Sequence, residues 1–137
     1  MKNLEIYIHI PFCVKNVHTV IFFRLRRRRK RKGSTCWRCC GEIRSFPRKE
    51  EYEVVSVFFG VVPQSVWPSD WIEMVLVALH DTFSFVNEPE ITIECNPGTA
   101  DVSKLVAYRS LGINRISFGL QSTDDRELRL LGRIPQL

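Results

Sequence analysis

Short apolar segments alternate with segments of helical period along most of this chain, and that alternation constrains the fold more than any other feature. Residues 4–10 alternate apolar and polar side chains, which is the two-residue period of a half-buried strand. Further strands are predicted at 54–59, 90–95 and 115–120. Helices are predicted at 69–83, from Thr99 or Asp101 to Gly112, and at 124–131.

Strands joined by helices in this order pair in parallel through right-handed crossovers. The predicted fold class is therefore α/β, with parallel strands and crossover helices in the manner of a (β/α) barrel. The segment from residue 4 to residue 10 is expected to lie beside 54–59 in the sheet. Four strands do not close a barrel, so the barrel is incomplete and the chain represents part of one.

Length and cysteine content limit the remaining classes. A chain of 137 residues forms one domain at most, and its apolar runs are all far shorter than the ~20 residues of a membrane span. The alternating N-terminus does not resemble a signal peptide, so we expect a cytoplasmic protein with no membrane partner. Five cysteines, an odd number, favour reduced thiols or metal ligands over a disulfide framework.

The net charge of +5 comes from one segment. Residues 24–32 carry eight positive charges, so the chain without them would have a net charge of −3. The charged positions are Arg24, Arg26, Arg27, Arg28, Arg29, Lys30, Arg31 and Lys32. Such a run repels itself, and residues 16–40 as a whole fit neither a strand nor a helix. We therefore expect 16–40 to be a displaced or disordered basic segment outside the sheet.

The basic run has a functional interpretation of its own. It can bind nucleic acid or another polyanion by counterion release, here without interleaved aromatic residues for base stacking, so any such binding would be non-specific. The alternative is a solvated segment with no selected partner. A small basic nucleic-acid-binding protein is thus the second function class that the sequence leaves open.

The run Ile-Tyr-Ile-His-Ile-Pro-Phe-Cys at residues 6–13 resembles the opening of a known family. It is similar to radical S-adenosylmethionine (SAM) proteins of the oxygen-independent coproporphyrinogen III oxidase group, and among them to HemW-type haem chaperones. The resemblance covers residues 4–13 and about 42–134. It implies that 1–137 is the N-terminal part of a radical SAM barrel. It also implies a [4Fe–4S] cluster, SAM, and a haem or porphyrin partner.

The same resemblance implies roles for individual residues. Cys13 matches the first cluster ligand, and Gly60 matches the start of a glycine-rich loop. Glu94 matches an acid that binds the ribose hydroxyls of SAM, a task that suits a carboxylate because it accepts from two donors. The remaining SAM-contacting positions implied are Tyr7, Gln121 and Arg133. The plain alternatives are a solvated glutamate at a strand end and an arginine that complements a helix dipole.

Two departures from the family pattern put its chemistry in doubt. The family continues as Cys-x-x-x-Cys-x-x-Cys, whereas this chain has Val17 and Val20 after Cys13. The family loop Gly-Gly-Gly-Thr-Pro-Ser becomes Gly-Val-Val-Pro-Gln-Ser at residues 60–65, which puts side chains where the backbone should approach SAM. One thiolate cannot hold the cluster. We therefore expect no catalytic residue, no cluster, and little or no SAM binding.

Cysteines 36, 39 and 40 allow another interpretation, half of a zinc or cluster site, but a structural site needs four ligands and no matching second pair follows.

A displaced reading frame would explain together the missing family cysteines, the cysteines at 36–40 and the altered glycine loop. Residues 16–22 can be encoded so that another frame reads Cys-Thr-Tyr-Cys-Asp-Phe. The codons of residues 36–40 can likewise be chosen so that another frame reads Leu-Ala-Leu-Leu. Those of residues 61–64 can be chosen so that another frame reads Gly-Gly-Thr-Pro. We hypothesise small insertions or deletions flanking codons 16–40 and 61–64, arising from a gene lesion or a sequencing error.

Overall fold

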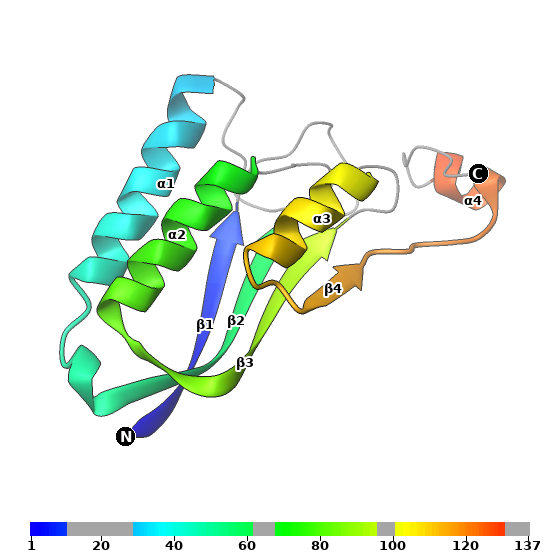
Figure 1. Ribbon diagram of the computed structural model, residues 1–137. Coiled ribbons are helices and arrows are strands. Elements are labelled where there is room, and N and C mark those ends of the chain that lie inside the picture. The colour runs from blue at the N-terminus through cyan, green and yellow to red at the C-terminus, as the bar shows by residue number, and fades with distance from the viewer. Residues whose placement is uncertain (11–28, 62–67, 96–100, 131–137) are drawn as a thin grey trace.

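The four predicted strands form one parallel sheet. The computed structural model describes residues 1–10, 29–61, 68–95 and 101–130 (Figure 1). The strands are β1 (Lys2–Ile10), β2 (Tyr52–Val61), β3 (Ser84–Cys95) and β4 (Arg115–Phe118). They follow each other across the sheet in chain order, and every neighbouring pair is parallel. This confirms the α/β fold with an incomplete barrel.

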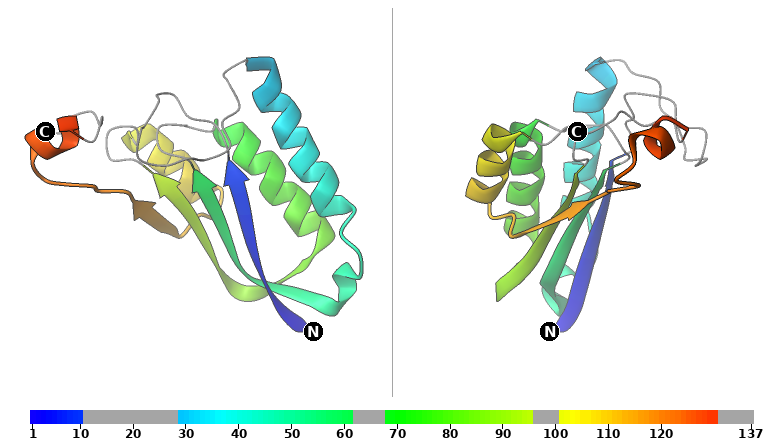
Figure 2. Two further views of the ribbon diagram at one scale, coloured as in Figure 1. Left: turned by 180° about the vertical axis from the view of Figure 1, so that it is seen from behind. Right: turned by 90° about the vertical axis from the view of Figure 1, so that its right-hand side faces the viewer.

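Helices α1 (Arg29–Arg44), α2 (Ser69–Thr82) and α3 (Val102–Ser110) connect the strands and lie on one side of the sheet, with a short 3-10 turn at Lys49–Glu51 before β2. Helix α4 (Asp125–Leu130) follows β4 and lies apart from the other three (Figures 1 and 2). Helices α2 and α3 lie over one face, and α1 packs beside α2 on the β1 side (Figures 1 and 2). Asp101 is the N-cap of α3, since its carboxylate accepts from the Lys104 N–H at 2.9 Å. Gly112 follows α3 with φ of +91°, as expected of a glycine that ends a helix.

The two faces of the sheet carry different side chains because strand residues alternate in direction. One row of paired residues faces the core that the helices complete. This row consists of Ile8, Phe59, Ile93 and Ile116. The neighbouring row faces the opposite side and is polar or aromatic. It consists of Tyr7, Phe58, Thr92 and Arg115.

The prediction that residues 16–40 contain no helix is wrong for 29–40. These residues belong to α1, and Cys36 and Cys40 are one turn apart on its buried side. Their thiols point at backbone carbonyls of α2, with Sγ atoms 3.6 Å from Trp71 O and 3.7 Å from Met74 O. The two cysteines act as small apolar side chains that bury α1 against α2. Residues 16–28 lie outside the described residues, so a displaced segment there stays a prediction.

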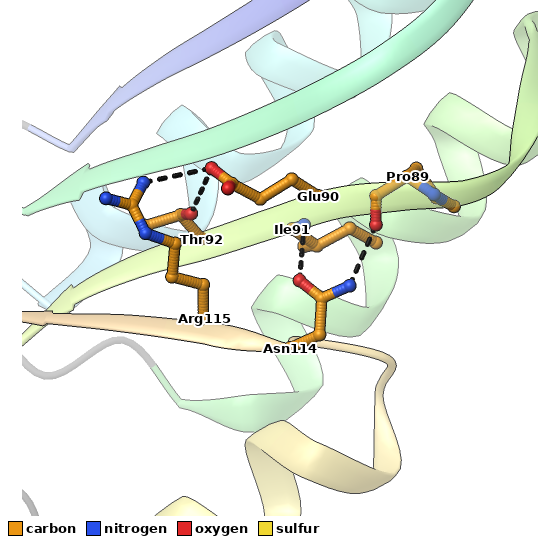
Figure 3. Close-up of polar contacts among 6 residues, drawn as sticks. All are labelled: Pro89, Glu90, Ile91, Thr92, Asn114 and Arg115. Atoms are coloured by element: carbon orange, nitrogen blue, oxygen red, sulfur yellow. Dashed lines mark hydrogen bonds and ion pairs between the residues drawn. The ribbon is translucent and has the colours of Figure 1, made fainter.

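Strand β3 begins six residues earlier than predicted, because Pro89 does not interrupt it. Proline cannot donate to the strand ladder, and the pairing of β2 with β3 is irregular in this region. The Asn114 side chain bonds β3 on both sides of Glu90: its Oδ1 accepts from Ile91 N at 2.8 Å, and its Nδ2 donates to Pro89 O at 2.8 Å (Figure 3). Asn114 thus fixes the start of β4 against β3.

Candidate functional site

Parallel pairing brings the carboxyl ends of all four strands to one edge of the sheet, where α/β proteins bind their ligands. Four of the six predicted site residues are described there, namely Tyr7, Gly60, Glu94 and Gln121. Cys13 and Arg133 lie outside the described residues, as does most of the altered loop at 61–65.

Tyr7 and Gly60 are in contact across β1 and β2. The Tyr7 ring is 62% exposed and stacks on Phe58, with ring centroids 5.7 Å apart. Its hydroxyl lies 3.3 Å from His9 Nδ1, and the two rings are also stacked. A Cβ atom at position 60 would collide with the Tyr7 hydroxyl and lie 2.5 Å from its Cζ. Only a glycine at position 60 leaves the Tyr7 ring in this place.

Glu94 lies one strand away on the same face. It is half-buried near the end of β3 and pairs in register with Ser117 of β4. Its carboxylate has no hydrogen bond or ion pair with any described residue, so its oxygens are available to donors. Its charge adds to burial in raising the pKa of the adjacent Cys95 thiol.

Gln121 is exposed and follows the end of β4 by three residues. Within the described part of the chain, no hydrogen bond joins it to Glu94 or Tyr7. The structure therefore brings Tyr7 and Gly60 together and places Glu94 on the same face.

Several residues on this face were missed by the sequence analysis. Glu90 Oε1 accepts from Arg115 Nη1 and from Thr92 Oγ1, each at 3.0 Å, so an ion pair links β3 and β4 one row below Glu94 (Figure 3). His9 and Phe58 hold the Tyr7 ring between them. For Glu90 and Thr92, the signal in the sequence was the polar residue at every second position of β3.

The thiols of the described residues do not fit a three-thiolate cluster. Cys36 and Cys40 are buried between α1 and α2, and burial raises the pKa of Cys36 to about 12, with Cys40 beside it as a smaller cause. Cys39 and Cys95 are half-buried, and burial raises the pKa of both thiols. No group of three or more potential metal ligands occurs among the described residues. Cys13 thus remains the one thiol at a family ligand position, and the residues present do not fit the cluster.

No family model matches the chain. It is similar to the mouse protein named radical S-adenosyl methionine domain-containing protein 1, mitochondrial, with 35% identity over 93% of this chain and 29% of that protein. The heme chaperone HemW of Synechocystis is 34% identical over 93% of this chain and 32% of that protein. The oxygen-independent coproporphyrinogen III oxidase of Salmonella typhimurium is 27% identical over 96% of this chain and 29% of that enzyme.

A solved structure has the same fold. Coproporphyrinogen III oxidase (HemN) from Escherichia coli, a radical SAM enzyme, superposes with a TM-score of 0.79 at 24% identity. The match covers 96% of this chain and 31% of that one. The chain is therefore homologous to one segment of radical SAM proteins. More particularly, its relatives are those of the HemW and oxygen-independent coproporphyrinogen III oxidase type. It spans 29–32% of the length of the three relatives named above, and their names give no support to a nucleic-acid-binding function.

No helix in the described part of the chain is long and apolar enough to cross a bilayer.

Proposed function

We propose that this chain corresponds to the SAM-binding segment of a HemW-type radical SAM protein and that, with its present sequence, it does not carry out the radical reaction. One observation supports this most: the carboxyl end of the sheet keeps Tyr7, Gly60 and Glu94, while Cys36, Cys39 and Cys40 belong to α1 and Cys95 is the one described thiol at this end. The names of the relatives point to heme delivery or coproporphyrinogen oxidation. From these names we carry over to this chain only the general area of chemistry, which is haem or porphyrin metabolism in the cytoplasm.

In this proposal the residues that remain would contact the nucleoside end of SAM. The Glu94 carboxylate is free to accept from ribose hydroxyls, and the exposed Tyr7 ring offers a stacking face. Gln121 and Arg133 would add polar contacts. The methionine end has lost its support, because valines follow Gly60 in place of glycines and a single cysteine stands at the cluster position.

Calorimetric titration of the purified chain with SAM tests the proposal. We expect weak binding or none, and micromolar affinity without iron would contradict it. A Val61→Gly/Val62→Gly variant should bind more tightly, because removing two side chains lets the backbone approach the ligand. Adding Glu94→Gln to that variant should remove the gain. A gain that persists with Gln at position 94 would show that Glu94 does not bind the nucleoside.

A further inference from the structure

The free side of β1 borders a groove that shares only Tyr7 with the candidate SAM site. β1 is an edge strand, so one row of its backbone N–H and C=O groups has no neighbouring strand among the described elements. Consecutive β1 residues from Leu4 to His9 line the groove, as does the inner side of α1. Its volume is about 440 Å³. Figure 2 shows the open side of β1 next to α1.

The floor of the groove is apolar. Leu4 and Ile6 of β1 and Ile43 of α1 line it and are half-buried, so each still has surface to lose. Phe46 is 40% exposed and packs edge-on against Phe83, with ring centroids 5.5 Å apart. A strand laid along β1 would therefore find both a ladder partner and an apolar surface on one of its faces.

Two carboxylates border this floor. Glu5 comes from β1 and Glu42 from α1, and both side chains are exposed. Neither forms an ion pair or a side-chain hydrogen bond with any described residue. Basic groups elsewhere in the fold do pair, as Lys2 does with Glu51 and Arg115 with Glu90. The groove thus offers two unpaired negative charges in a chain whose net charge is +5.

We propose that this groove binds an extended peptide segment that adds a strand to β1, with apolar side chains at alternate positions and Lys or Arg beside Glu5 and Glu42. The charges favour a basic peptide over a second copy of this chain. Ile6 is the midpoint of β1, so two copies paired antiparallel about it would set Glu5 opposite Tyr7 and diagonal to Glu5 of the other copy, within reach of its long side chain. Like charges at such close range destabilise pairing, whereas a basic peptide is attracted.

Fluorescence anisotropy with a labelled eight-residue peptide of alternating valine and lysine tests this proposal on the full chain. We expect saturable binding and slower amide exchange along β1 in the complex. Glu5→Gln/Glu42→Gln should weaken binding by about two- to fivefold for each charge, the range for exposed ion pairs. The matched control is Glu73→Gln/Glu88→Gln, which removes two exposed carboxylates that do not line the groove and should leave affinity unchanged.

Three results would overturn the proposal. The first is equal loss of affinity in the groove variant and the control variant. The second is equal binding of a peptide in which glutamate replaces lysine, or glycine replaces valine. The third is sedimentation of the chain as a dimer that Glu5→Gln strengthens, which would make a second copy the occupant.

Discussion

The two faces of the sheet are held in different ways, and the contrast separates fold from chemistry. On the helix-covered face Phe59 and Ile93 are fully buried, and they pack in the core that α1 and α2 complete. On the opposite face Tyr7 is mostly exposed, and Glu94 has no partner among the described residues. The covered face holds the buried core of the barrel segment. The fold shared with the relatives is therefore present in a sequence that has valines at two cysteine positions of the family pattern and no glycine loop.

Adjacent phenylalanines of β2 test this contrast with the largest expected effect. Phe59 faces the core and is 0% exposed, whereas Phe58 faces the open side and is half-buried. Phe59→Ala should lower the free energy of unfolding by about 3–5 kcal/mol, because it leaves a cavity that the core cannot fill. Phe58→Ala should lower the free energy of unfolding by less than half as much. Urea denaturation measures both, and equal losses would show that the two faces do not differ in this way.

The buried thiol of Cys36 should make the stability of the covered face depend on pH. Burial raises its pKa from 9.0 to about 12, so the folded state requires a neutral thiol at pH values where the unfolded chain ionises. The stability from this group is complete below about pH 9 and falls as the pH rises above that value. Unfolding by urea at pH 8 and pH 10 should show the decrease. Cys36→Val, which has no titrating group, should flatten the profile, and an unchanged slope in this variant would contradict the argument.

The basic run at residues 24–32 tests the second function class and should give the smallest effect. Any affinity of the chain for DNA is predicted to come from residues 24–32, to fall steeply with salt and to be independent of base sequence. Electrophoretic mobility shifts of labelled DNA at several salt concentrations measure it. Deleting residues 24–32 should abolish binding. Binding that survives the deletion, or that discriminates between sequences, would reveal a nucleic-acid site elsewhere.

The strands and two of the connecting helices could be predicted from the sequence because their patterns are local. Residues 54–59 and 115–118 are β-branched or apolar at regular spacing, and the helical period of α2 is continuous. Helix α1 could not be predicted from the sequence, because its buried side is formed by Cys36 and Cys40, and cysteines spaced in this way also suggest metal ligands. The continuation of β3 through Pro89 depends on Asn114, which is 25 residues away in the chain.

The candidate site was predictable only as far as its residue types. The resemblance identified Tyr7, Gly60 and Glu94, but the collision that a larger residue at position 60 would cause depends on the register of β1 against β2. The ion pair between Glu90 and Arg115 depends likewise on the pairing of β3 with β4. Register between strands is set by long-range packing, and a single sequence does not show it.

The displaced reading frame stays a prediction that the nucleotide sequence can test. Codons 16–22, 36–40 and 61–64 should yield the family cysteines, an apolar helix segment and the glycines in another frame. Codons that cannot do so would end the hypothesis.

Anaerobic incubation of the purified chain with ferrous iron and sulfide tests the central claim most directly, namely that the family fold is present without the family cofactor. Bound iron and sulfide are then counted per chain, and the absorption spectrum is recorded. The account predicts no [4Fe–4S] spectrum and no stoichiometric iron, because in the sequence Cys13 alone stands at a ligand position of the family and valines stand at the other two. A chain that takes up a complete [4Fe–4S] cluster would contradict it.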